Sequence, residues 1–248
     1  MKKILIFAFL LITNFAFSQS NFVKAKTIPM ISLNYSLQFP QHDMAERFGI
    51  NSMIGSSFYL KLESNFIFGI EANYLFGNQI EEDEIFDLLK TSNGEIINLY
   101  GEYADYILSE RGYFLGAKIG YLFPVLSPNE NSGILFYTNF GFLEHKIRID
   151  NNGNNTPQII NDYAKGYDRL TNGFALNEFI GYSFLSDNGK INFYVGFETY
   201  QAWTKNRRDF NFDTKQKDNT DRKDFLYGIR FGWIIPIQKQ KADNYYIR

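Results

Sequence analysis

The sequence contains no cysteine and only two histidines, His42 and His145. The lack of cysteine excludes disulfide bonds and thiolate metal sites, so packing and hydrogen bonds have to hold the fold together. Two histidines leave few candidates for a catalytic base. We therefore expect neither a metal centre nor a cofactor.

A long hydrophobic run is also absent after the first 18 residues, so no transmembrane helix of ~20 apolar residues is expected. Those first residues read MKKILIFAFLLITNFAFS. Lys2 and Lys3 precede an apolar run over 4–12 and a small-residue motif at 16–18, which predicts a cleaved signal peptide over 1–18. The alternative, an anchor helix, is disfavoured because the apolar run is short. A lipoprotein is excluded because no cysteine lies near the cleavage site.

Charges of the two signs are nearly balanced. Removal of the two signal-peptide lysines moves the formal net charge from −2 to about −4, which gives no indication of a nucleic-acid partner. The remaining chain of about 230 residues suits one domain, and no repeat or linker divides it. We expect a single domain over 19–238, followed by a periplasmic tail over 239–248.

Aromatic residues are in excess, at 18% of the chain, and they follow a period of two. In 27–39, for example, Ile31, Leu33 and Tyr35 alternate with polar residues, as in a β-strand. Every segment of this kind is long enough to cross a bilayer as a tilted strand, which takes ~9–11 residues. Eight segments show the pattern: 27–39, 49–62, 65–77, 112–124, 133–148, 171–186, 190–204 and 222–237.

The composition of the two strand faces distinguishes a soluble protein from a membrane protein. In DFLYGIRFGWIIPI, 224–237, one face is bulky and apolar while the other carries Gly228, Arg230 and Gly232. A soluble sandwich, the alternative, would cover its outer faces with Lys, Glu and Thr. The faces here carry Gly, Ser and Asn, which suit a narrow, curved interior. The pattern predicts an all-β fold: an eight-stranded antiparallel up-and-down transmembrane β-barrel with a plugged, side-chain-filled lumen.

The lengths of the connections indicate the orientation of this barrel. Short and generally longer connections alternate along the chain, as periplasmic turns and surface loops do in outer-membrane barrels. This predicts an integral outer-membrane protein with both termini in the periplasm. The segment 94–108 also resembles a strand, but a ninth strand would leave the C-terminus outside, so we assign it to a surface loop. Helical turns are expected at 84–90.

Charged residues on the inner faces are predicted to pair across neighbouring strands. Glu71 and Lys118 lie at matching distances from their turns, and so do Glu198 and Arg230 on the last two strands. Charge is tolerated in a narrow lumen only when it is paired, and eight strands enclose a space that side chains can fill. The pairs favour a stabilising plug over an ion path, and they argue against a porin.

The histidines allow one alternative function, an enzyme that acts on lipid at the outer surface. His145 lies near the predicted outer rim, next to Glu144. Adjacent strand residues point to opposite faces, so the two form a dyad only if a bulge intervenes, and the apolar alternation does shift parity between 140 and 149. No serine pattern accompanies them. We expect a non-enzymatic protein without catalytic residues, in which His145 is a hydrogen-bonding residue of the rim.

Three further features bear on binding. Glu178 shares a strand face with Phe174 and Ile180, so either the strand is misregistered or the carboxylate meets another protein in the membrane. Arg207 and Arg208, in the last long loop, bind anionic lipid phosphate, as in lipopolysaccharide, or pair with acidic residues of the loops. The acidic run EEDE is interpreted as solvated charge rather than a Ca²⁺ site, because it lacks spaced ligands.

The last predicted strand contains the motif Gly228-x-x-Phe231-x-Trp233. It resembles the terminal-strand signal read by the β-barrel assembly machine, which implies that this machine is a partner during insertion. Such a signal usually ends the chain. Here the tail QKQKADNYYIR follows it and is free to contact a periplasmic component.

The signal peptide ending in Phe-Ser-Gln and the motifs KGYDRLTNG, NRRDFNFDT and YGIRFGWIIPI resemble small outer-membrane barrel proteins of the Bacteroidota type. The resemblance covers most of the mature chain. It implies an accessory barrel of an outer-membrane assembly or type IX secretion complex, hence a non-enzymatic scaffold subunit with outer-membrane or periplasmic protein partners. A free-standing surface adhesin or ligand-binding barrel, and the lipid-modifying enzyme, are the alternatives.

Overall fold

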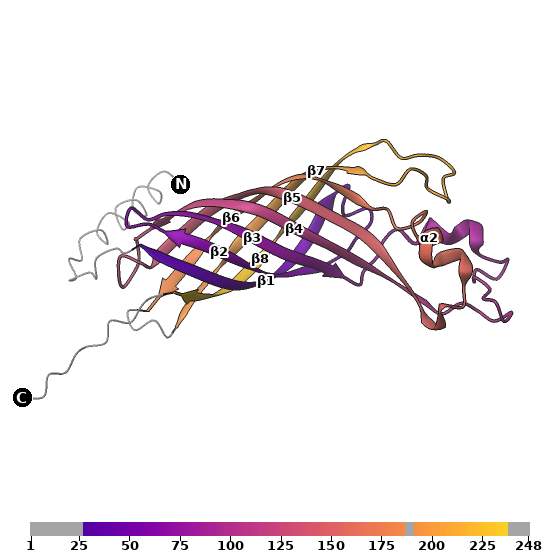
Figure 1. The fold of residues 1–248 in the computed structure, drawn as a ribbon, viewed down its shortest axis with the longest axis horizontal. Helices are drawn as coiled ribbons and strands as arrows, with labels where there is room; N and C mark the ends of the chain where they lie inside the picture. The colour runs from indigo at the N-terminus through magenta and orange to yellow at the C-terminus, as the bar shows by residue number, and fades with distance from the viewer. Residues whose placement is uncertain (1–26, 187–190, 238–248) are drawn as a thin grey trace, which may run out of the picture.

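The chain forms a closed barrel of eight antiparallel strands in a computed structural model that describes residues 27–186 and 191–237. Each strand pairs with its neighbours in sequence, and β1 pairs with β8 to close the barrel (Figure 1). The predicted signal peptide over 1–18 and tail over 239–248 lie outside the described residues. The strands are β1 (Ile28–His42), β2 (Asn51–Lys61), β3 (Phe66–Gly77), β4 (Tyr106–Phe123), β5 (Gly133–Asn151), β6 (Thr171–Leu185), β7 (Asn192–Asn206) and β8 (Asp221–Pro236).

The two ends of the barrel differ. At one end the connections between strands have at most nine residues. At the other end three of the four connections are longer, and they carry the few helical turns (Figure 1). These turns are η1 (Asp83–Leu89), η2 (Asn152–Asn154), η3 (Pro157–Ile159) and α2 (Asn161–Ala164). The prediction of helical turns at 84–90 is confirmed by η1, and no ninth strand forms at 94–108, where the chain makes an isolated bridge before β4 begins. We call the end that carries α2 the loop end.

The apolar face of each strand points outward. In β8, Phe231 and Trp233 are 51% and 57% exposed, whereas Arg230, directly before Phe231, is fully buried. This arrangement is the reverse of a soluble protein, in which apolar faces are buried. No described helix is long and apolar enough to cross a membrane, a finding that concerns helices alone. The exposure of these side chains confirms the prediction that the apolar faces of the strands point outward.

The lumen contains two buried apolar clusters, and large aromatic side chains are part of both. The expectation of a lumen lined by small and polar residues is therefore incomplete, because it did not include these aromatic side chains. Glycines make room for the rings: a Cβ on Gly181 or Gly196 would lie 2.6 Å or 2.8 Å from the ring of Phe179. The glycines on the inner faces thus allow aromatic rings to lie flat against the barrel wall.

The shift of apolar parity in β5 has a different cause from the bulge considered above. The pairing of β5 with β4 and with β6 is continuous in register, so no bulge is present. Phe140 points outward and is half exposed, while Ile147 points inward and is fully buried in the cluster at the loop end. The parity shifts because the interior becomes the apolar side once the strand passes beyond the outer apolar belt.

Candidate functional site

Arg230 of β8 lies at the centre of a polar layer that separates the two apolar clusters of the lumen. Its Nη1 donates to Glu71 Oε1 at 2.7 Å and to the hydroxyl of Tyr137 at 2.8 Å. Its Nη2 donates to the hydroxyl of Tyr200 at 2.7 Å, and its Nε lies 2.7 Å from Glu198 Oε2. One guanidinium therefore joins residues of β3, β5, β7 and β8 across the barrel.

Lys118 of β4 extends this layer. Its Nζ lies 2.6 Å from Glu71 Oε2 and 4.0 Å from the centre of the Tyr137 ring. Opposite it, Gln38 of β1 donates from Nε2 to Glu198 Oε1 at 2.7 Å. Two carboxylates and two cations make the layer neutral, and the four charged side chains are almost completely buried.

The four charged residues expected as two separate pairs thus lie in one connected cluster. Glu71 is within ion-pair distance of Lys118 and of Arg230, and Arg230 is also close to Glu198. Sequence reasoning missed Tyr137 and Tyr200, whose hydroxyls complete the coordination of Arg230. Both tyrosines lie at inward-facing positions of their strands. This position could have identified them as members of the polar layer, because a buried tyrosine hydroxyl usually has a hydrogen-bond partner.

His145 pairs with Thr171, the first residue of β6, and so lies near the loop end as expected, but its side chain points into the barrel and is fully buried. Its Nε2 is 2.8 Å from Asp224 Oδ2, which also accepts a hydrogen bond from the Thr204 hydroxyl at 2.5 Å. Phe48 packs edge-on against the imidazole. In the described part of the chain, no serine or threonine hydroxyl forms a hydrogen bond with His145. Glu144 points the other way and accepts from Asn172.

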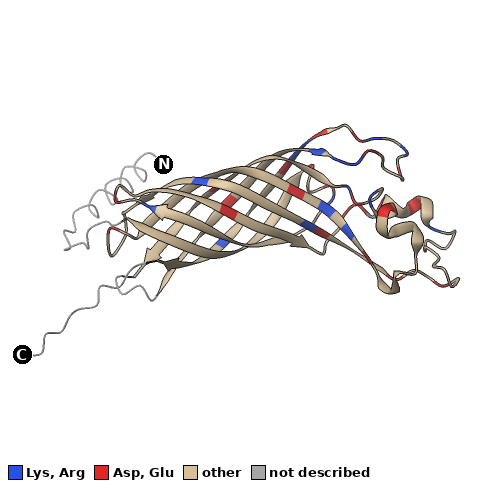
Figure 2. Cartoon of the chain, in the orientation of Figure 1, with Lys and Arg blue, Asp and Glu red and all other residues tan. Residues whose placement is uncertain are grey.

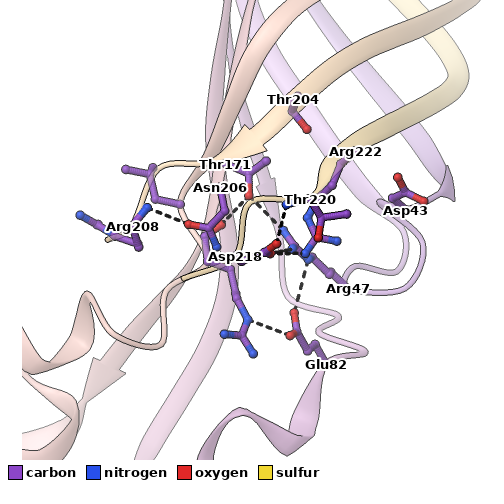
Figure 3. A network of polar contacts seen from close by, with 12 residues as sticks. Asp43, Arg47, Glu82, Thr171, Thr204, Asn206, Arg208, Asp218, Thr220 and Arg222 are labelled. Atoms are coloured by element: carbon purple, nitrogen blue, oxygen red, sulfur yellow. Dashed lines mark hydrogen bonds and ion pairs between the residues drawn. The ribbon is translucent and has the colours of Figure 1, made fainter. Parts of the chain in front are cut away.

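A second network of charges lies at the loop end (Figure 3). Arg169, which follows α2, bonds to Glu82 at 2.8 Å and to Asp213 through two hydrogen bonds of 2.9 Å and 2.5 Å. Burial lowers the pKa of Arg169, but the hydrogen bond that it donates to Asp213 and the charge of Glu82 outweigh this effect, so the pKa is raised. Arg47 approaches Glu82 at 3.5 Å and donates to Thr171 at 3.0 Å.

Asp218 ties the last connection into the same network (Figure 3). Its carboxylate accepts from the backbone N–H of Thr220 at 3.0 Å and from Arg222 Nη2 at 2.5 Å, and Arg47 lies 4.0 Å away. Burial raises the pKa of Asp218, but these hydrogen bonds and the charge of Arg222 lower it to about 2. All four connections at the loop end are thereby linked by ion pairs. We call the residues of this network the loop lock: Arg47, Glu82, Arg169, Asp213, Asp218 and Arg222.

Arg207 and Arg208 both make contacts within the protein. Arg208 forms a bidentate pair with Asp168, with Nε 2.7 Å from Oδ1 and Nη2 bonded to Oδ2. Arg207 donates from Nε to Asn172 Oδ1 at 2.5 Å and is more exposed. Of the two arginines, Arg208 is therefore paired with an acidic side chain, as one alternative expected, whereas the partner of Arg207 is an amide.

Glu178 points outward from the middle of β6. The strand pairs in continuous register on both sides, so the alternative of local misregistration is wrong. Thr138 and Thr199 lie directly across from Glu178 on the neighbouring strands, and the Thr199 hydroxyl is 3.5 Å from Glu178 Oε2. The three side chains form a polar row across three strands within the exposed apolar belt. We call them the polar row.

The residues of the expected assembly signal lie on β8. Phe231 and Trp233 are exposed on the outer wall, and Gly228 faces the lumen, where a Cβ would lie 2.2 Å from the carbonyl oxygen of Leu37. Recognition by the assembly machine remains a prediction.

Metal binding finds no support among residues 27–186 and 191–237. No group of three or more histidine, aspartate and glutamate side chains there is arranged to hold an ion. Glu81 and Glu84 of the acidic run are exposed, whereas Glu82 turns inward to the loop lock.

No protein-family model matches the chain, and no curated protein matches its sequence. Solved structures with similar folds include Ail, the attachment invasion locus protein of Yersinia pestis, at 9% identity and a TM-score of 0.44, covering 84% of this chain and 99% of that one. Ail in complex with the heparin analogue sucrose octasulfate gives a TM-score of 0.39 at the same identity and coverage. The outer membrane protein OprG of Pseudomonas aeruginosa is 12% identical, with a TM-score of 0.41 and coverage of 85% and 96%. At these identities and TM-scores the similarities carry no information about activity.

Proposed function

We propose that this protein is an integral outer-membrane barrel that forms no open channel and serves as a scaffold or accessory subunit of an outer-membrane protein complex. An exposed apolar wall supports the membrane location, because it is favourable in lipid and costly in water. Closure of the sheet supports it as well, since a closed barrel has no unpaired strand edge. The short turns and both termini lie on the periplasmic side in this proposal, and the loop end faces outward.

The polar layer of the lumen supports the absence of a channel. Arg230, Glu71 and Glu198 are buried across the centre of the barrel and satisfy one another. An ion entering this layer would have to displace a charge-assisted hydrogen bond, the strongest class of hydrogen bond in proteins. Purified protein inserted into planar lipid bilayers is expected to show no stepwise conductance. Steps of open-channel size would contradict the plug.

The polar row is the single observation that carries the subunit role. A carboxylate facing lipid in the middle of a barrel is unfavourable, although less so than a lysine or arginine there. Thr138 and Thr199 surround Glu178 with further hydrogen-bonding groups. A neighbouring membrane protein that donates a hydrogen bond to Glu178 would remove the cost and gain a fixed orientation.

The test compares copurification from outer membranes solubilised in a mild detergent. The protein carries an affinity tag after Arg248, and the variants are Glu178→Leu and, as a control, Ser56→Leu, an outward-facing position on β2. We expect a stoichiometric set of outer-membrane or periplasmic proteins with the wild type and the control, and its loss with Glu178→Leu. Equal recovery with both variants would contradict an interface at Glu178, and a lone wild-type barrel would contradict the subunit role.

A second candidate function is a free-standing surface barrel whose loops bind external ligands. The loop lock favours it, because ion pairs among all four connections hold them in one arrangement, as a binding surface requires. A lipid-modifying enzyme has no comparable support, since His145 is sealed inside the barrel.

A further inference from the structure

The connections at the loop end line a cavity of about 470 Å³ that is open to solvent and lies outside both networks described above. Its lining comes from three different connections: Leu89 of η1, Pro157 and Gln158 of η3, Tyr163 and Tyr167 in and after α2, and Phe212. The volume lies within the usual range for ligand sites, and a mainly apolar wall with a single amide is typical of them.

Aromatic packing builds the floor of this cavity. The Tyr167 ring packs edge-on against Phe212, with their centres 5.5 Å apart, and against Phe86 on its other side at 5.2 Å. Gly166 lets the Phe212 ring lie against the backbone, because a Cβ there would be 2.1 Å from the ring. The backbone N–H of Phe212 donates to the Gly166 carbonyl at 3.0 Å, and this bond holds the backbone that carries the ring.

The loop lock holds the walls of the cavity in place. Arg169 lies two residues after Tyr167 and joins Glu82, beside η1, to Asp213, the residue after Phe212. The wall residues therefore belong to segments pinned to one buried guanidinium. A pocket formed in advance avoids the entropic cost of ordering loops on binding.

The surface around the cavity exposes apolar and aromatic side chains that no lipid would cover at this end of the barrel. Tyr163 is 61% exposed at the cavity, Leu88 58%, and Tyr100 75%. The connection 78–105 is joined to 152–170 by the hydrogen bond from the Leu99 N–H to the Asn155 carbonyl, so these residues belong to one surface. Exposed tyrosines among asparagines and glycines are the composition of protein-binding loops in antibodies, where tyrosine gives contact area at little entropic cost.

The charge of this surface indicates the charge of its partner. The connection 78–105 carries eight acidic residues and only one basic residue, Lys90, which gives a formal charge of −7. Figure 2 shows the acidic residues of η1 at the loop end. Glu84 and Asp87 are exposed on η1, the same turn that supplies Leu89 to the cavity, and Asp87 also forms a solvent-exposed pair with Lys90 at 2.6 Å. Complementary charge steers a partner and selects it, so a basic partner fits and an acidic one is repelled.

We propose that the loop end is a docking surface for a basic polypeptide, which inserts an apolar or aromatic side chain into the cavity while its lysines or arginines face Glu84 and Asp87. The cavity provides the buried anchor that such interfaces need, and the acidic turn next to it provides selectivity. This site lies at the opposite end of the molecule from the short turns and does not involve the polar row. Its test is therefore independent of the complex proposed through Glu178.

The experiment uses purified full-length protein in nanodiscs of zwitterionic lipid and three peptide probes, with empty nanodiscs as the blank. The probes are Gly-Lys-Trp-Lys-Gly, the same peptide with alanine in place of tryptophan, and the same peptide with glutamine in place of both lysines. Titration calorimetry is expected to show that the first binds about tenfold more tightly than either of the others.

Variants then assign the binding to the site. Tyr163→Ala and the double variant Glu84→Gln/Asp87→Asn are each expected to weaken binding of the first peptide about tenfold. Glu63→Gln, an exposed acid on the β2–β3 turn, is the matched control and leaves binding unchanged. All altered side chains are exposed. Electrophoresis of heated and unheated samples checks that each variant is folded, because a folded barrel changes its mobility when it is heated. No binding to the wild type, equal binding of all three probes, or binding of a neutral oligosaccharide in their place would overturn the proposal.

Discussion

Arg230 and Glu71 are 159 residues apart in sequence, yet Arg230 Nη1 lies 2.7 Å from Glu71 Oε1 with both side chains fully buried. Within the lumen, Arg230 stands between two carboxylates, and each carboxylate has a further donor. Lys118 forms an ion pair with Glu71, and Gln38 donates a hydrogen bond to Glu198. The interior of this barrel therefore contains a charge-balanced polar layer between two apolar clusters, in which the loss of one charged member leaves a charge without compensation.

Removal of the central guanidinium is expected to destabilise the barrel strongly. In Arg230→Met, Glu198 loses its ionic partner and Glu71 keeps one cation, Lys118, so the free energy of unfolding should fall by about 3–5 kcal/mol. Urea unfolding in detergent micelles, followed by tryptophan fluorescence, measures it. The compensated variant Arg230→Met/Glu198→Gln should recover part of the loss. An unchanged unfolding midpoint in the single variant would contradict the assigned role of Arg230.

The loop lock should respond to acid only below pH 4. The pKa of Asp218 is lowered to about 2 from an ordinary 3.8, so its contribution is complete above about pH 4 and is lost as the pH falls towards 2. Pepsin cleavage of the last connection should increase over this range, after correction for pepsin activity on an unstructured substrate. Asp218→Asn should already be cleaved at pH 4. Identical cleavage of both proteins from pH 4 to 2 would contradict the prediction.

Arg169 is expected to control the order of the loop end without affecting the barrel. It has a left-handed backbone (φ 52°) and bonds to Glu82 and Asp213, so Arg169→Met should release both connections. Hydrogen exchange of 78–105 and 207–220 should become at least about tenfold faster, since ~1.4 kcal/mol of protection corresponds to that factor. The exchange of β2 and β3 should stay unchanged. A matched substitution, Lys165→Met at an exposed pair with Asp162, should alter neither.

The inner glycines should be intolerant of even a methyl group. A Cβ on Gly196 would lie 2.3 Å from the Ile180 carbonyl oxygen and 2.8 Å from the Phe179 ring, so Gly196→Ala should lower the free energy of unfolding by about 1–3 kcal/mol. Ser56→Ala, outward on β2, is the control and should change it by less than about 0.5 kcal/mol. The measurement compares the urea concentrations at which half of each variant is unfolded. Equal midpoints would contradict the claim that the lumen has no room for a methyl group at Gly196.

Sequence patterns were sufficient for the wall of the barrel. Period-two alternation identified all eight strands, and the glycine-rich second faces showed that the apolar side is outside, as Phe231 and Trp233 illustrate. Both conclusions depend on neighbours in sequence, because a side chain's face is set by its parity along one strand. For the same reason, parity correctly placed Glu178 on the outer wall.

Contacts across the lumen were decided only by the tertiary structure. Parity shows that Arg230 and Glu71 both point inward, but closure and register determine that they meet, and a strand pattern contains neither. The burial of His145 was missed for the same reason, since it depends on Phe48 and Asp224 from distant connections and strands. The sequence by itself determined which side of each strand faces outward. Only the closed barrel decided which inward side chains touch, because those contacts join residues that the chain brings together by curving back on itself.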